Sequence, residues 1–131
     1  MEYPNFWLAD VGAAFSVLVF DEYVIKVPRK NKYFTQLKDL AKLQNILAEK
    51  VDGILPCEIH SNCLVMPTAP GVRVDKLDDK TKRRAKQLAD EMGKEIIKAG
   101  YKPKDMGENN TFYDEKEDKL YFVDLHLVRR I

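Results

Sequence analysis

The chain has 131 residues, of which 45% are hydrophobic and 33% charged, and its 22 lysines and arginines nearly balance its 21 acidic residues. This length, with 10% aromatic residues, predicts one folded domain over residues 1–131 and excludes disordered, collagen-like and two-domain proteins. The formal net charge of +1 gives no general attraction to polyanions, so nucleic acid is not favoured as a partner.

The amino-terminal part of the chain predicts strands followed by a helix. Residues 15–20 (FSVLVF) and 23–27 (YVIKV) are apolar and β-branched, and the two polar residues between them predict a tight hairpin. Across 33–51 apolar residues recur at helical spacing, and Gly53 provides a stop. We therefore expect two paired strands and then one long helix with a buried face.

A second hairpin and a connector follow the helix. Two short apolar runs, 56–60 and 63–66, flank a Ser-Asn pair that is typical of turns. The segment 67–74 (PTAPGVRV) has two prolines and a glycine, which predicts a stiff connector. We expect it to join an amino-terminal half, 1–66, to a carboxy-terminal half, 75–131.

The carboxy-terminal half predicts a second long helix and a third hairpin. Asp78 or Asp79 is suited to cap the helix, whose apolar residues recur every three or four positions. The basic run 80–86 (KTKRRAK) falls on its outer face, which is either solvated or binds an acidic partner or nucleic acid. Residues 111–114 and 119–125 then alternate as a hairpin.

Two further patterns bear on location and on metal binding. No apolar run approaches the length of a membrane-spanning helix, so we expect a soluble, cytoplasmic protein with no membrane partner. Cys57, His60 and Cys63 form a C-x-x-H-x-x-C pattern. A structural zinc site needs four ligands and the only other histidine is His126, so buried strand cysteines are the favoured interpretation.

Three polar features have the residue types that phosphate chemistry uses. Lys26 lies inside an apolar strand, where it is either an exposed edge residue or a cation positioned for phosphate. Asp105 precedes Asn110 by five residues in a polar loop, and Asp124 closes the apolar run YFVDL. Carboxylate and carboxamide oxygens suit Mg²⁺ and proton acceptance, so together these residues favour phosphoryl transfer.

In these features the chain resembles the protein-kinase-like fold family. Val24-Ile25-Lys26 is similar to the V-A-I-K strand of kinases, and Asp105 with Asn110 matches the D-x-x-x-x-N spacing of their catalytic loop. Asp124 in Val-Asp-Leu matches the metal-binding aspartate of D-F-G. The resemblance covers nearly the whole chain, although each motif is partial.

The resemblance extends to the segments that bind the nucleotide base in this family. The stretch from Gly12 to Val17 looks like a glycine-rich loop that keeps one glycine and the valine that covers adenine. Met66 takes the place of the gatekeeper before the hinge. In this family adenine bonds a backbone carbonyl and an N–H two residues later, which fall here on Pro67 and Ala69.

The resemblance implies an α+β fold: a five-stranded antiparallel sheet with one long helix, then a shortened second lobe of one long helix and a β-hairpin. It implies binding of ATP with Mg²⁺ and phosphate transfer to a small molecule, to the protein itself or to a partner protein; departures from the family pattern predict that this transfer is slow. Lys26 would contact the phosphates, Asp105 would orient or accept the hydroxyl proton, and Asn110 with Asp124 would hold the metal.

Departures from the family pattern support a second hypothesis. Gln44 falls where the family has the glutamate that pairs with the lysine, unless the register differs and Asp39 or Glu49 faces it. The sequence also stops at Ile131, soon after Asp124, which predicts that no platform for peptide substrates forms. The alternative function is therefore an inactive, pseudokinase-like binding or inhibitor module that acts through protein contacts. The substrate is left open, and self-association is plausible.

Overall fold

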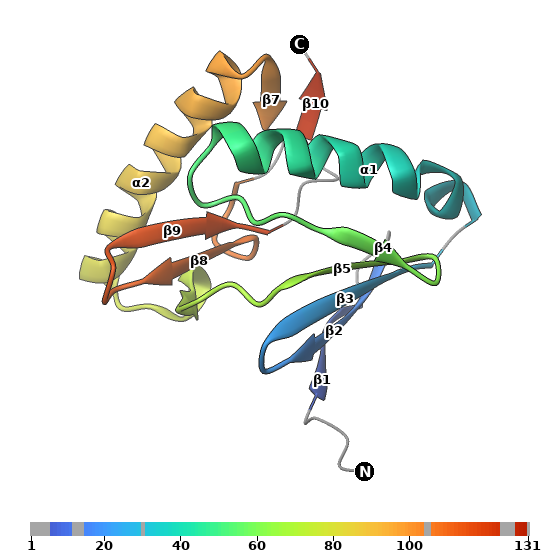
Figure 1. Ribbon diagram of the computed structural model, residues 1–131. Helices are drawn as coiled ribbons and strands as arrows, with labels where there is room; N and C mark the ends of the chain where they lie inside the picture. Colours follow the sequence, from blue (N-terminus) through green and yellow to red (C-terminus); the bar gives the residue numbers. More distant parts are fainter. Residues whose placement is uncertain (1–5, 12–14, 30, 104–105, 124–127, 131) are drawn as a thin grey trace. The chain divides into compact units, whose positions relative to one another are not determined.

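The computed structural model describes residues 6–11, 15–29, 31–103, 106–123 and 128–130 (Figure 1). It divides into two compact units, one formed by residues 1–45 and 56–68 and the other by residues 46–55 and 69–131. Both units combine helix with antiparallel strands. The predicted α+β fold class is therefore confirmed.

The first unit contains an antiparallel sheet whose strand order is β1-β2-β3-β5-β4. Its strands are β1 (Phe6–Val11), β2 (Phe15–Phe20), β3 (Tyr23–Pro28), β4 (Glu58–His60) and β5 (Cys63–Pro67). Both predicted hairpins of this half, β2–β3 and β4–β5, are confirmed. In the second hairpin, Ser61 and Asn62 have φ angles of 48° and 63°, as a tight two-residue turn requires.

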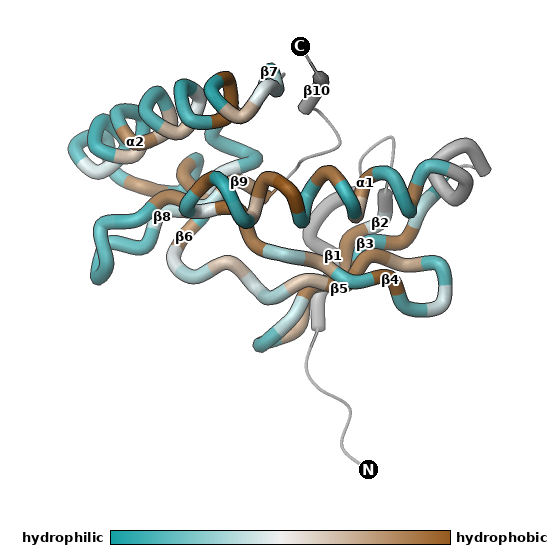
Figure 2. Tube along the Cα trace, turned by 45° about the horizontal axis from the view of Figure 1, so that its top comes forward, coloured by the Kyte–Doolittle hydropathy of each residue, from teal (hydrophilic) through white to brown (hydrophobic). Residues whose placement is uncertain are grey.

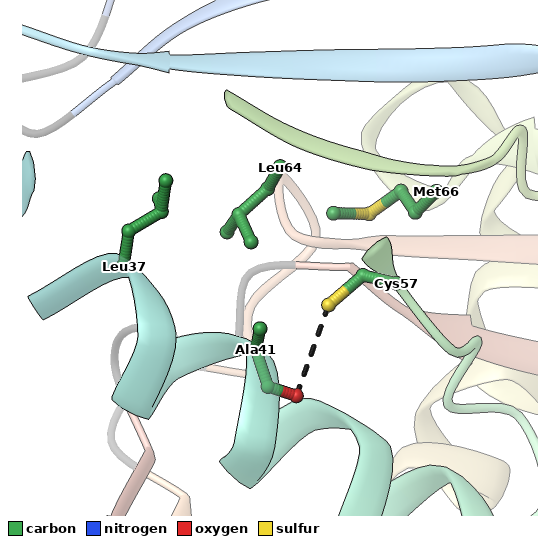
Figure 3. Packing of buried hydrophobic residues seen from close by; sticks show 5 residues of the cluster. All are labelled: Leu37, Ala41, Cys57, Leu64 and Met66. Atoms are coloured by element: carbon green, nitrogen blue, oxygen red, sulfur yellow. Dashed lines mark hydrogen bonds between the residues drawn. The ribbon is translucent and has the colours of Figure 1, made fainter. Parts of the chain in front are cut away.

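Helix α1 (Asn31–Lys50) packs against this sheet, as its apolar periodicity predicts. Along the helix, apolar positions alternate with hydrophilic ones (Figure 2). Leu37 and Ala41 of α1 form a buried cluster with Cys57 and with Leu64 and Met66 of β5 (Figure 3). This cluster is the core of the first unit.

The second unit is built around helix α2 (Asp79–Lys98), whose N-cap is Asp78. The cap is formed by the Thr81 N–H, which donates to Asp78 Oδ1 at 2.8 Å. Ala85, Met92 and Ile96 lie on the buried face of the helix. The predicted hairpin consists of β8 (Thr111–Asp114) and β9 (Lys119–Phe122).

The segment predicted as a connector contains secondary structure of its own. Strand β6 (Val72–Arg73) adds to the hairpin in the order β6-β8-β9, and a 3-10 helix, η1 (Val74–Lys76), follows it. Gly71 has a φ of 93° and packs against the Tyr113 backbone, where a Cβ would overlap the Tyr113 carbonyl. The second half is therefore more than a helix and a hairpin. It also contains β7 (Tyr101–Pro103), paired with β10 (Val128–Arg130).

Ion pairs connect α2 to other parts of the second unit. Arg84 binds Asp118 in the β8–β9 turn through two hydrogen bonds of 2.6 and 3.0 Å, and the Tyr113 hydroxyl donates to the same carboxylate. These contacts lower the pKa of Asp118 to about 2.

Lys82 pairs with Glu108 at 3.6 Å. Part of the basic run thus makes internal contacts, while Lys80, Arg83 and Lys86 are exposed.

Within the described ranges, no helix has the length and apolar character that crossing a membrane requires.

Candidate functional site

Lys26 is buried in the middle of β3, with 8% of its surface exposed. It lies directly opposite Val17 of β2 and opposite Leu64 of β5. Residues directly opposite each other in antiparallel strands project from the same face of the sheet. Leu64 belongs to the cluster that packs against α1, so Lys26 and Val17 lie on that covered face. Of the two interpretations of this lysine, the structure excludes the exposed edge residue.

Met66 lies on the same face of the sheet as Lys26. It is opposite Val24 on β3, two residues before Lys26, and side chains two apart on a strand share a face. Its exposed fraction is 5%. Three of the residues predicted to bind nucleotide, Val17, Lys26 and Met66, are therefore brought together on one face of the first unit.

Gln44 is the buried member of the three α1 residues considered as partners of the lysine. It is 5% exposed, whereas Asp39 and Glu49 are exposed. Its Nε2 donates a hydrogen bond to Met66 Sδ at 3.6 Å. A neutral carboxamide thus stands on the buried face of α1 and contacts the predicted gatekeeper directly.

Cys57 shows the electrostatic character of this region. Burial raises the pKa of its thiol to about 11, and the positive charge of Lys26 opposes part of this rise. The Cys57 backbone is held by Asn45, whose side chain donates to the Cys57 carbonyl at 3.0 Å and accepts from its N–H at 2.8 Å. The thiol donates to the Ala41 carbonyl at 3.9 Å.

The three residues of the C-x-x-H-x-x-C pattern contact separate groups. While Cys57 contacts Ala41, the His60 ring bonds Glu58 at 2.9 Å and the Cys63 thiol donates to the Ser61 carbonyl at 3.6 Å. Of the three, only Cys57 is buried. In the described part of the chain, each of these three side chains therefore makes a local structural contact of its own.

Thr68 fixes the segment that follows β5. Its N–H donates to the Glu22 carbonyl at 3.1 Å, and its hydroxyl donates to the Phe20 carbonyl at 2.9 Å. The Thr68 N–H points toward the β3 side of the strand. Backbone groups of successive strand residues point to opposite sides, so the backbone N and C=O of Pro67, one residue earlier, face away from β3. Pro67 therefore loses no hydrogen bond to β3 by lacking an N–H, and its carbonyl points away from that strand.

Asn110 lies at the end of the loop that precedes β8. Its N–H donates to the Gly107 carbonyl at 3.0 Å, and its own carbonyl accepts from the Val123 N–H at 3.1 Å. Val123 comes directly after β9 and directly before Asp124. The β8–β9 hairpin thus brings Asn110 beside the residue that precedes the second predicted metal ligand.

Three predicted site residues, Gly12, Asp105 and Asp124, lie outside the described residues. Their roles stay predictions. The predicted hinge residue Ala69 is half-buried. It is the first residue of the segment 69–131, which belongs to the second unit.

Two positioning contacts were not predicted. Thr68 anchors the predicted hinge, and Thr111 donates its hydroxyl to the Gly107 carbonyl at 3.1 Å in the loop that ends at Asn110. Threonine is common both in strands and in turns, so the pattern gives little signal for either role. At position 111 the one available sign is a threonine directly before the two aromatic residues of β8.

Comparison with solved structures identifies the fold. The structure of the ADP-bound aminoglycoside phosphotransferase APH(2'')-Ib matches 98% of this chain and 67% of that chain, with a TM-score of 0.73 and 13% identity. A structure of WbdD matches 100% of this chain with a TM-score of 0.66 and 13% identity. A structure of WbdD with the kinase inhibitor LY294002 matches 99% with a TM-score of 0.59 and 14% identity.

The chain has a protein-kinase-like fold. It spans 67% of the phosphotransferase and about a third of WbdD. No protein-family model matches the sequence, and neither does any curated protein. At these identities the likeness is one of fold.

Proposed function

We propose that this protein binds ATP together with Mg²⁺ and transfers phosphate slowly to a small molecule, to itself or to a partner protein. The observation that carries the proposal is the placement of Val17, Lys26 and Met66 on one face of a kinase-like sheet. The ADP bound to the similar phosphotransferase supports a nucleotide as the ligand.

In the first unit, the proposed roles follow from charge and backbone geometry. Lys26 supplies a positive charge for the phosphates from a position that the strand ladder fixes on both sides. Met66 and Val17 offer apolar surface to the base. The Pro67 carbonyl, which faces away from β3, accepts a hydrogen bond from the base, and the Ala69 N–H donates one.

In the second unit, the donor set fits Mg²⁺. Asn110 provides a carboxamide oxygen and Asp124 a carboxylate, and hard oxygen ligands of this kind are those that Mg²⁺ prefers. The hydrogen bond between the Val123 N–H and the Asn110 carbonyl holds the main chain next to both residues. The bound cation would supply charge neutralisation at the phosphates. Asp105 orients the acceptor hydroxyl or accepts its proton.

We expect phosphate transfer to be slow. Gln44 carries no charge, so it cannot form the carboxylate–lysine ion pair by which kinases position the lysine. The loop between Gly12 and Val17 has a single glycine with which to follow the phosphates. Because phosphoryl transfer depends mainly on positioning, the loss of both devices lowers the rate more than it lowers nucleotide affinity.

The Asp105→Asn variant tests the catalytic proposal. We expect it to abolish residual ATP hydrolysis and self-phosphorylation while leaving the affinity for Mg-ATP within about twofold, because a proton acceptor acts on the reaction and not on the bound nucleotide. Radiolabelled phosphate release and calorimetry measure the two quantities. Asp90→Asn, on the exposed face of α2, is the control. Unchanged hydrolysis in Asp105→Asn would refute the assignment.

The neutral Gln44 favours one second candidate, a pseudokinase-like binding module. Such a module uses the same fold to bind a partner and needs no phosphate transfer. Nucleotide binding without any hydrolysis or self-phosphorylation in the wild type would support this candidate over the enzyme.

A further inference from the structure

Thr111 makes a side-chain hydrogen bond at the entry to β8. Its side chain is almost fully enclosed, with 2% of the residue exposed. Its hydroxyl donates to the Gly107 carbonyl at 3.1 Å, and the Asn110 N–H donates to the same carbonyl at 3.0 Å. One carbonyl oxygen therefore accepts from two successive residues and closes the turn of residues 107–110.

The same turn is fixed at other points by the backbone. The Asp75 N–H donates to the Glu108 carbonyl at 3.2 Å, and the Val123 N–H donates to the Asn110 carbonyl at 3.1 Å. Both main-chain groups of Asn110 thus have defined partners, one of which is shared with Thr111. The direction in which Asn110 leaves the turn depends on the Gly107 carbonyl, and the Thr111 hydroxyl helps to hold that carbonyl in place.

We propose that Thr111 is a positioning residue for metal-dependent nucleotide binding. Its hydroxyl orients the turn that presents Asn110, and it contacts neither the metal nor the nucleotide. The inference rests on the proposed function, because it requires Asn110 to act as a metal ligand. Groups that orient metal ligands from behind commonly change metal affinity by about 10- to 100-fold when they are removed.

Two conservative variants separate positioning from stability. Thr111→Val keeps the side-chain volume and loses the hydroxyl, and the Gly107 carbonyl keeps its bond from Asn110. Thr111→Ser keeps the hydroxyl and loses a buried methyl group. We expect the valine variant to change metal dependence with little loss of stability, and the serine variant to do the reverse.

The experiment measures ATP affinity by calorimetry on the full chain, once with Mg²⁺ and once with EDTA, and compares the ratio of the two dissociation constants. We expect Thr111→Val to reduce the Mg²⁺-dependent gain in affinity about tenfold and to leave the affinity in EDTA unchanged. Thr111→Ser keeps the wild-type ratio and unfolds at a lower temperature. If the valine variant does not fold, Thr111→Cys, a weaker donor, gives an intermediate ratio.

The outcomes separate the two proposals. A wild-type ratio in the folded valine variant, or in the cysteine variant where valine does not fold, overturns the role of Thr111 and leaves the proposed function intact. Equal loss of the ratio in the serine and valine variants also overturns it, because the hydroxyl would then be irrelevant. If ATP binding by the wild type does not depend on Mg²⁺, the metal site of the proposed function fails, and the role of Thr111 fails with it.

Discussion

Lys26 and Cys57 share the buried side of the first unit, and the charge of Lys26 affects the ionisation of the Cys57 thiol. The Lys26 cation favours the thiolate of Cys57, but burial disfavours it more strongly, so the pKa of the thiol rises from 9.0 to about 11. Only the strand register and the helix packing reveal this proximity. The two residues are 31 positions apart in the sequence, and nothing in the pattern C-x-x-H-x-x-C indicates it.

The raised pKa of Cys57 predicts a loss of stability at high pH. Below pH 9 the thiol is protonated in both the folded and unfolded states, so it adds no pH dependence. Between pH 9 and about 11 the unfolded state loses the proton first, which favours unfolding. Denaturant titrations at pH 8 and pH 10 should show the wild type losing roughly 1 kcal/mol more than Cys57→Ala. Equal pH dependence in the wild type and in Cys57→Ala would contradict the burial of the thiol.

Some residues of the candidate site could be predicted from the sequence, but the contacts between them could not. Lys26, Met66 and Gln44 were found because their spacing matches a family pattern, and the register then places two of them, with Val17, on one face. The contact of Gln44 with Met66 could not be predicted, because it depends on how α1 packs against the sheet. Local periodicity shows which face of a helix is buried but not which side chain it meets.

At the scale of elements, the sequence predicted what depends on local pattern. Both long helices and all three hairpins have strong periodicity or turn residues, and the structure contains them. Strand β6 was missed because two residues carry no period and its pairing with β8 joins distant segments. The pairing of β7 with β10 was missed for the same reason.

The loop after α1 depends on a glycine that approaches the second-unit hairpin closely. Gly53 has a φ of 98°, its carbonyl accepts from the Phe122 N–H at 3.1 Å, and a Cβ there would overlap the Leu120 carbonyl and Met92. The sequence indicated only that Gly53 ends a helix. The structure shows that the same residue also joins this loop to β9.

This contact predicts different effects for two glycines with similar backbone angles. Gly100 has a φ of 94°, and a Cβ there would meet nothing within 4 Å. Gly100→Ala therefore has only the cost of the left-handed conformation, about 1–2 kcal/mol. Gly53→Ala has the same cost plus the overlap with backbone, so we expect a loss of at least about 3 kcal/mol. Denaturant unfolding of the two variants measures both, and equal losses would show that Gly53 has no close contact.

At the scale of the whole molecule, the fold was predictable and the chemistry is proposed. Five partial motifs in the right order pointed to a kinase-like fold, and three solved structures that match have that fold at 13–14% identity. The proposed role of Asp105 rests on spacing alone, and that of Asp124 rests on spacing and on its described neighbour Val123. Asn110 and Val123 provide that link for Asp124 through their hydrogen bond.

Thermal unfolding with and without Mg-ATP tests the central claim, that Lys26 belongs to a nucleotide site. A ligand that binds only the folded state stabilises it by about 2.7 kcal/mol at a hundred times its dissociation constant, and we expect the wild type to show this gain. Lys26→Met should lose most of it with and without Mg²⁺, and Asp124→Asn should lose only the Mg²⁺-dependent part. Lys42→Met, at an exposed position of α1, should respond like the wild type. No stabilisation of the wild type at millimolar Mg-ATP, or full stabilisation of Lys26→Met, would contradict the account.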